Sequence, residues 1–228
     1  MTSSPVEAEL DYDLGHPGGE PDIPHLIQMV FDNSASICAA QGGGDPIGQR
    51  FDEAAAAIRN LQTRTRGRSR SRTRIQVRHF DVPSRYVTSP GFMKDRGHMA
   101  QVYGNLRVPP DVRGSSSLGP VLGSLEQDAQ RGTESGYWPQ LIVFSDFLLT
   151  DPDLDGLYQR LGEFPGEVHA VCLGQPPSRQ VQEAVDATYY IATDAKPGAV
   201  ARSLSAALTA NRPNAEPVDV SDVVLTER

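Results

Sequence analysis

The stretch LIQMVFDNSAS, residues 26–36, sets the fold class. Five of its first six residues are apolar, and a run of this length and composition predicts a strand that is buried on both faces. Asp32 follows the run directly, and Ser34 and Ser36 come next at alternate positions. In open parallel sheets ligands bind at the carboxyl ends of the strands, so these three side chains are candidate binding residues.

The rest of the chain alternates short apolar runs with amphipathic stretches. We expect further strands at 75–80, 141–144, 168–173 and 189–192, and helices at 47–61, 118–130, 155–164, 178–187 and 198–210. The stretch 83–117 is rich in Pro, Gly and Ser and is predicted to be irregular, apart from a short strand near 86–87. Strands and helices that take turns predict an α/β fold with a doubly wound, mostly parallel sheet flanked by helices on both faces.

Both ends of the chain are acidic. Residues 1–22 contain six acidic residues and no basic one, and residues 211–228 are also acidic. We therefore predict flexible acidic tails at 1–22 and 211–228 around one domain at 23–210. The net charge of −8 excludes a uniformly basic surface of the kind that coats nucleic acid.

Features of the sequence that report on compartment point to the cytoplasm. Residues 1–22 lack the basic and apolar regions of a secretory signal. No apolar run reaches the roughly 18 to 20 residues that a membrane span needs. Cys38 and Cys172 are too few for a disulfide framework and lack CxxC spacing. We expect a cytoplasmic protein with reduced cysteines and no membrane span.

Two other loops carry similar side chains to the same edge of the predicted sheet. Ser145 and Asp146 follow the strand at 141–144, and a Ser-rich run at 114–117 precedes the helix at 118–130. Carboxylate and hydroxyl oxygens, completed by water, suit a hard divalent cation such as Mg²⁺ or Mn²⁺. No Cys or His cluster that would favour zinc accompanies them.

In these residues the chain resembles the von Willebrand factor A (vWA) domain family. The metal-ion-dependent adhesion site (MIDAS) of that family begins with the motif DxSxS at the end of the first strand, continues with a Thr before a helix, and ends with an Asp after a buried strand. The resemblance implies five metal ligands, direct or through water: Asp32, Ser34, Ser36, Ser116 and Asp146, with Ser115 as the alternative to Ser116. Phe147 replaces the family's usual Gly, and we expect its ring to lie beside the metal.

The resemblance, to bacterial-type single-domain members, also implies a function. In the family a bound Mg²⁺ keeps one position for an Asp or Glu of a partner protein, which makes the domain an interaction module and not an enzyme. Bacterial relatives work beside AAA+ ATPases or in other multi-protein assemblies. A Mg²⁺-dependent phosphoryl-transfer hydrolase is the less favoured alternative, because such enzymes need a second acid where Ser34 stands and the sequence has no phosphate-binding loop motif.

Arginine recurs at alternate positions between the first predicted helix and the second strand. The run comprises Arg64, Arg66, Arg68, Arg70, Arg72 and Arg74. Such runs are usually solvated, but this one could also bind a polyanion or a protein partner. No aromatic residue lies between the arginines, which argues against nucleic acid. A metal-free scaffold that binds through this Arg-rich loop, residues 64–74, or through the tails is therefore a further alternative. We also expect the acidic residues 1–22 to fold over the Arg-rich loop.

Overall fold

A computed structural model of the chain describes residues 12–37, 50–65, 72–80, 86–107, 114–221 and 223–227. Its strands are β1 His25–Phe31, β2 Arg74–His79, β3 Gly91–Phe92, β4 Trp138–Ser145, β5 Glu167–Leu173, β6 Ala187–Ile191 and β7 Val224–Glu227. Its helices are α1 Arg50–Thr65, α2 Arg96–Leu106, α3 Gly119–Glu134, α4 Leu154–Gly162, α5 Arg179–Ala184 and α6 Ala199–Thr209.

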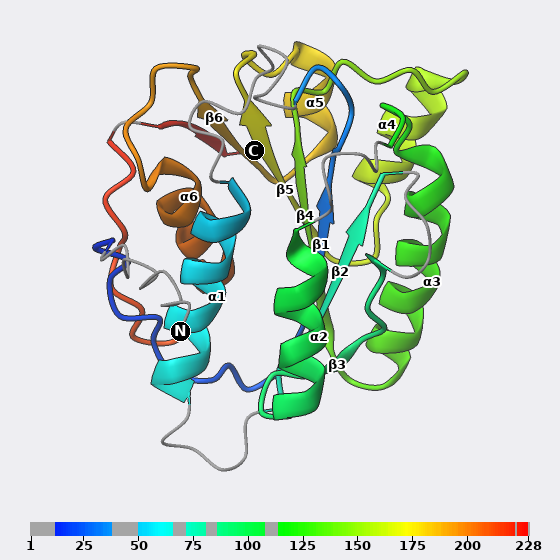
Figure 1. Cartoon of the computed structure of the whole chain (residues 1–228). Coiled ribbons are helices and arrows are strands. Elements are labelled where there is room, and N and C mark those ends of the chain that lie inside the picture. The colour runs from blue at the N-terminus through cyan, green and yellow to red at the C-terminus, as the bar shows by residue number, and fades with distance from the viewer. Residues whose placement is uncertain are drawn as a thin grey trace, which may run out of the picture.

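The strands form one mixed sheet in the order β3-β2-β1-β4-β5-β6-β7. The five inner strands are parallel, whereas β3 and β7 at the two edges run antiparallel to their neighbours. β1 and β4 lie at the centre of the sheet (Figure 1). Every residue of β1 is buried. This confirms the predicted doubly wound α/β architecture, since an apolar run buried on both faces belongs in the middle of such a sheet.

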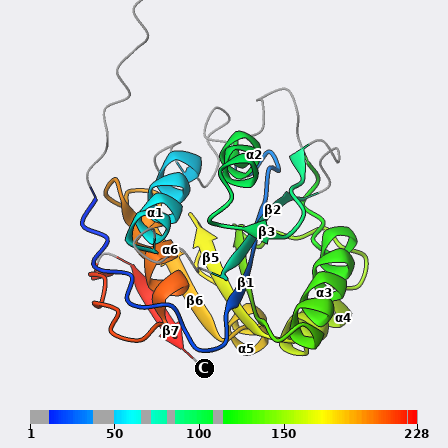
Figure 2. The ribbon, with the colours of Figure 1, turned by 90° about the horizontal axis from the view of Figure 1, so that it is seen from below.

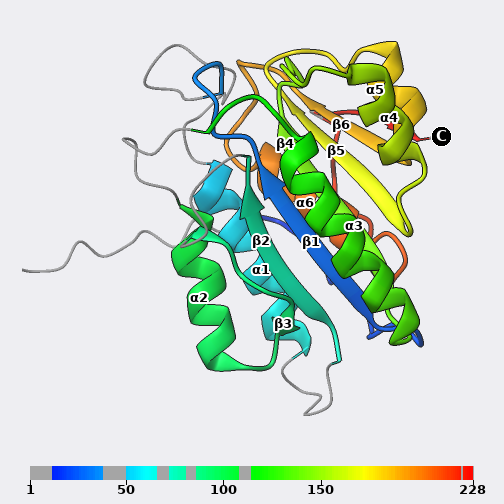
Figure 3. The same cartoon turned by 90° about the vertical axis from the view of Figure 1, so that its right-hand side faces the viewer.

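Helices cover both faces of the sheet. α1, α2 and α6 pack on one face, over a core that includes Met29, Ile142 and Val171. α3, α4 and α5 pack on the other face, over a second core that includes Val30 and Val143 (Figure 2). α3 lies along β1 and β4 on this second face (Figure 3). Consecutive residues of each central strand thus point into different cores, which is why these strands carry apolar residues at consecutive positions.

The stretch 83–117 is more regular than predicted. It contains β3 and the three-turn helix α2, and the short strand expected near 86–87 is absent from the described residues 86–90. Asp95 caps α2 by accepting hydrogen bonds from the amides of Gly97 and His98. Only Met99, Val102 and Leu106 on this helix are buried. An apolar stripe this narrow gives a weak helical pattern in a stretch rich in Pro, Gly and Ser, so the sequence does not predict the helix.

The described parts of the acidic ends lie against the domain. Leu14 is buried, and the backbones of residues 16–19 and 213–216 exchange two hydrogen bonds, Gly19 N to Pro213 O at 2.7 Å and Glu216 N to His16 O at 2.9 Å. Residues 224–227 form strand β7. Residues 12–22, 213–221 and 223–227 therefore differ from the flexible tails expected at these positions, while residues 1–11, 222 and 228 lie outside the described part of the chain. The predicted domain boundaries at 22 and 211 stay predictions.

Among the described helices, none combines the length and the apolar character that a membrane span requires.

Candidate metal centre

The register of β1 and β4 brings the first and third sequence motifs together. Phe31 pairs with Phe144 at the carboxyl ends of these parallel strands, and the amide of Asp32 donates to the carbonyl of Phe144 at 2.8 Å. Asp32 therefore lies beside Ser145, and Asp146 follows one residue later. The two carboxylates reach one edge of the sheet because both strands end at the same level.

Asp32 is the buried centre of a hydrogen-bonded cluster. Its side chain is 1% exposed; Oδ1 accepts from the amide of Ser34 at 2.7 Å and Oδ2 accepts from Ser145 Oγ at 2.7 Å. The hydroxyls of Ser34 and Ser36 lie 2.9 Å apart. Burial raises the pKa of Asp32, and the charge of Asp146 adds to that rise, although hydrogen bonds from Ser34 and Ser145 oppose it. A cation at this cluster would relieve both unfavourable effects.

Asp146 is held by a tight turn. Its Oδ1 accepts from the amide of Leu148 at 3.0 Å, and Phe147 between them adopts a positive φ of 56°. This conformation turns the ring of Phe147 into the core beneath α3, where it is 9% exposed. The ring therefore packs in the apolar core, and the expectation that it lies beside the metal stays a prediction. Leu148, 57% exposed, is the apolar side chain that the turn presents to solvent.

The Ser-rich segment reaches the same loop through its backbone. The amide of Thr150 donates to the carbonyl of Ser116 at 3.0 Å. Ser115 Oγ accepts from the amide of Ser117 at 3.2 Å, so its hydroxyl takes part in a local turn. The side chain of Ser116 is half-buried. Ser116 therefore stays the candidate ligand with Ser115 as the alternative, and the ligand set itself stays a prediction.

The donor set fits a hard divalent cation. It consists of two buried carboxylates and several hydroxyls, all oxygen donors of the kind that Mg²⁺ and Mn²⁺ prefer. In the part of the chain that the structure describes, no three His, Cys, Asp or Glu side chains are grouped closely enough to hold a metal by themselves. Serine hydroxyls and water would have to complete the coordination shell, as the MIDAS motif implies.

The sequence matches no protein-family model and no curated protein. Several solved structures are nevertheless similar in fold. One is the pilus adhesin SpaC from Lactobacillus rhamnosus GG, with a TM-score of 0.58, 13% identity, and coverage of 84% of this chain and 30% of that chain. Another is proximal thread matrix protein 1 from the mussel byssus with a zinc-occupied MIDAS motif, with a TM-score of 0.56, 16% identity, and coverage of 89% of this chain and 49% of that chain.

The chain has a vWA fold. An aerotolerance-related membrane protein from Bacteroides fragilis is similar over nearly its whole length, with a TM-score of 0.52, 10% identity, and coverage of 81% of this chain and 96% of that chain. The present chain spans about a third of the adhesin and half of the mussel protein. At these identities the likeness shows the vWA fold alone, and the metal-occupied site belongs to the mussel protein.

A second polar network, which no sequence motif predicts, lies next to the candidate metal centre. Asn33 Nδ2 donates to His79 Nδ1 at 2.6 Å, and Asn33 Oδ1 accepts from Arg50 Nη2 at 3.0 Å. His79 Nε2 lies 2.7 Å from the carbonyl of Asn105, so the ring is neutral with its proton on Nε2. Burial lowers the pKa of His79 to about 4, and the charge of Arg50 acts in the same direction. Asn33, which follows Asp32, is thus bonded directly to β2 through His79 and to α1 through Arg50, and His79 extends the network to α2.

Neither this network nor Ser145 carries a strong sequence signal. Asn33 stands at a variable position of DxSxS, and Ser145 gains its role only because β1 and β4 end at the same level. His79 and His169 lie inside β2 and β5, at positions where the sequence predicts strands, and both are buried. Cys172 is also buried, as expected for a structural thiol, and burial raises its pKa to about 12.

The described arginines of the Arg-rich loop make local contacts in the vWA domain. Arg72 donates from Nη2 to the carbonyl of Asp22 at 2.9 Å, and its amide donates to Glu20 Oε1 at 2.6 Å. The guanidinium of Arg74 lies 4.7 Å from the ring centres of both Phe92 and Tyr137. These contacts place part of the acidic segment against the end of the Arg-rich loop. The side chains of Arg64, Arg66, Arg68 and Arg70 lie outside the described residues, as does Cys38.

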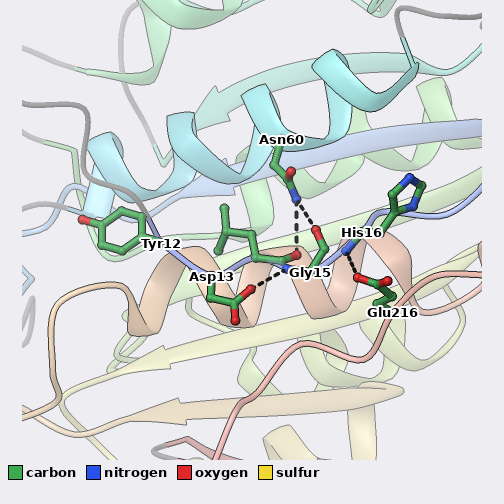
Figure 4. Close-up of a pocket in the computed structure, with 7 residues that line it drawn as sticks. Tyr12, Asp13, Gly15, His16, Asn60 and Glu216 are labelled. Atoms are coloured by element: carbon green, nitrogen blue, oxygen red, sulfur yellow. Dashed lines mark hydrogen bonds between the residues drawn. The ribbon is translucent and has the colours of Figure 1, made fainter.

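A separate pocket of about 620 Å³ lies where the two terminal segments meet α1 (Figure 4). Asn60 donates to the carbonyls of Leu14 and Gly15, and Glu216 accepts from the amide of His16 (Figure 4). No candidate metal ligand lines this pocket. Asn60 stands ten residues after Arg50, which is about 15 Å along α1 at 1.5 Å per residue. The pocket is therefore distinct from the candidate metal centre.

Proposed function

We propose that the chain is a metal-dependent protein-interaction module that binds an acidic residue of a partner protein through Mg²⁺ or Mn²⁺. The observation that carries the proposal is the pair of buried carboxylates at the ends of β1 and β4, surrounded by serine hydroxyls. Asp32, Ser34, Ser36, Ser116 and Asp146 would hold the ion, directly or through water. When bound, the ion supplies a coordination position that an Asp or Glu of the partner fills in place of water.

Binding fits the site better than catalysis. Metal-assisted hydrolysis needs a positioned general base or a second metal. Of the described histidines, His79 contacts Asn33 and Asn105, and His25 lies at the opposite end of β1 from Asp32. The pilus adhesin among the similar structures is an interaction protein by name. We therefore propose a non-enzymatic role in a multi-protein assembly in the cytoplasm, with an AAA+ ATPase as one candidate partner.

Leu148 completes the proposed contact surface. It is exposed, and its amide is bonded to the carboxylate of Asp146, so the side chain has a fixed place next to a candidate ligand. A partner whose acidic residue stands beside an apolar residue could cover Leu148 while its carboxylate reaches the metal. Burial of Leu148 would then add to the binding free energy that the metal–carboxylate bond supplies.

The first test is direct metal binding. Titration calorimetry with Mn²⁺ should show one site in the wild-type protein and none in Asp32→Ala. Asp153→Ala serves as the matched control, because Asp153 is exposed on the loop after β4 and its carboxylate accepts from the amide of Gly156 at the start of α4. Equal Mn²⁺ binding by the wild-type protein and Asp32→Ala would refute the assignment.

The second test is partner capture from native lysate, with the wild-type protein in Mg²⁺, the wild-type protein in chelator, and Asp32→Ala in Mg²⁺. A partner that is lost under the last two conditions supports the proposal. A partner that persists under all three would favour the metal-free scaffold, for which the contact between Glu20 and Arg72 is the supporting observation. Release of that partner by salt would identify the Arg-rich loop or the acidic segments as its binding site.

A further inference from the structure

The start of α3 is capped by a residue from a distant loop. The carboxylate of Asp151, which follows β4, accepts from the amide of Leu118 at Oδ2 (2.9 Å) and from the amide of Gly119 at Oδ1 (2.7 Å). α3 has no side-chain cap of its own, because its N-cap position holds Leu118, an apolar residue buried in the core. Asp151 therefore supplies both the acceptors and the negative charge that the start of a helix needs.

The close approach requires glycine at position 119. A Cβ at that position would lie 2.7 Å from Asp151 Oδ1, which is shorter than any normal contact. Pro120 follows in the first turn and has no amide hydrogen, so the carboxylate binds two of the few donors that this helix end offers. Gly119, Pro120 and Asp151 thus form one matched unit across 33 residues of sequence.

Two further hydrogen bonds join the same segments. The amide of Thr150 donates to the carbonyl of Ser116 at 3.0 Å, and Thr150 Oγ1 lies 3.4 Å from Ser117 Oγ. The segment that carries Ser116 is therefore fixed to the loop that carries Asp146 by contacts on both sides of Ser117. Asp151 provides the charge-assisted pair among them, and such bonds are the stronger kind.

We infer that Asp151 is a positioning residue for the candidate metal centre, which it serves by holding Ser116 in place relative to Asp146. The inference rests on the proposed function. Asp151 binds backbone amides with both carboxylate oxygens, so its effect on the metal passes through the backbone of residues 116–119. Residues that orient metal ligands in this indirect way typically change metal affinity by about 10- to 100-fold when they are removed.

The loop offers a matched control. Asp153 carries the same charge two residues further on, is exposed, and caps α4 through the amide of Gly156 at 2.9 Å. Asp153→Ala therefore removes an acid and a helix cap from the same loop without touching residues 114–119. Any effect of net charge or of general loop stability on metal binding should appear in both variants, and an effect of positioning should appear only at Asp151.

The test combines Mn²⁺ titration with hydrogen exchange in metal-free buffer. In Asp151→Ala we expect Mn²⁺ affinity to fall at least about tenfold and the amides of Leu118 and Gly119 to exchange faster. Asp151→Asn keeps one acceptor and should lie between Asp151→Ala and the wild-type protein. Gly119→Ala should reproduce the loss of affinity, since its Cβ displaces the carboxylate. Asp153→Ala should stay within about twofold of the wild-type affinity.

The outcomes separate this inference from the proposed function. A wild-type protein that binds Mn²⁺ and an Asp151→Ala variant that binds it equally well would overturn the inference alone. Equal losses in Asp151→Ala and Asp153→Ala would also overturn it, because charge would then explain the effect. A wild-type protein that binds no Mn²⁺ would overturn the proposed function and the inference with it. Thermal unfolding of each variant identifies one that fails to fold, and Asp151→Asn then serves in place of Asp151→Ala.

Discussion

Acidification should destabilise the protein through two buried histidines. Burial lowers the pKa of His25 to about 4, with help from the charges of Arg212 and His169, while Glu167 and Glu20 oppose the shift. The pKa of His79 is likewise lowered to about 4 by burial and by Arg50. In the unfolded chain both rings would titrate near 6.5. Between these values the unfolded state binds two protons that the folded state excludes, so stability falls as the pH drops.

The size of the effect follows from the two pKa values. For one histidine that shifts from 6.5 to about 4, the free energy of unfolding falls by about 1.8 kcal/mol between pH 7 and pH 5. The two histidines together should therefore lower the free energy of unfolding by about 3.5 kcal/mol between pH 7 and pH 5. This is a large share of the roughly 5 to 15 kcal/mol that stabilises a typical domain. Asp32, whose pKa is raised, acts in the opposite direction, since its neutral form is the one that the fold prefers.

The assay isolates the histidines by difference. Urea unfolding is measured at pH 7 and pH 5 for the wild-type protein and for the double variant His25→Gln, His79→Gln. The double variant should lose about 3.5 kcal/mol less stability than the wild-type protein over this range. His16→Gln is the control, because it removes a histidine from the terminal segment and leaves the sheet intact. Equal losses in the wild-type protein and the double variant would refute the reasoning; each single variant should remove about half of the effect.

Three further predictions concern single side chains, each measured by urea unfolding at pH 7. Asp32→Asn should raise the free energy of unfolding in metal-free buffer, because it removes a buried charge that Asp146 repels; a decrease would show that the hydrogen bonds of the carboxylate outweigh that repulsion. Glu53→Gln should lower the free energy of unfolding by about 2 to 3 kcal/mol, because the buried carboxylate accepts from three amides at the start of α6. Asp52→Asn, at the exposed neighbouring position, should lower it by under about 0.5 kcal/mol. Similar losses in the two variants would contradict this interpretation. Leu148→Asn should leave the free energy of unfolding within about 0.5 kcal/mol of the wild-type value and should weaken capture of a metal-dependent partner. Undiminished capture would show that Leu148 is not part of the contact surface.

The fold could be predicted from the sequence because its strongest signals are local. The central strands are buried on both faces, so they appear as mostly apolar runs, interrupted in β1 by Gln28, that need no knowledge of the partner strand. α2 was missed for the converse reason. Its 11 residues include Gly97 and Gly104, and only three of its side chains are buried, so the helical period is faint. The cap at Asp95 was the one local signal that could have identified its start.

The candidate site was predictable only as far as its motifs extend. DxSxS located Asp32 at a strand end, and the sheet register brings Asp146 to the same edge. The hydrogen bond from Ser145, the network around Asn33 and the cap from Asp151 depend on which strands and loops become neighbours. The direction of Phe147 depends on a single positive φ, which sequence does not report for a residue other than Gly.

Strand β7 also bears on aggregation. It pairs along the whole of β6 except its last residue, and β6 reads ATYYI, a segment with high β-propensity, no charge and no proline. Without β7, the backbone amides and carbonyls of this segment would form an open edge that could recruit the same segment of another chain. β7 itself is short, exposed, and ends with Glu227, which makes it a poorer template for such pairing. Truncation before residue 224 should therefore expose an edge at β6 that nucleates fibrillar assembly.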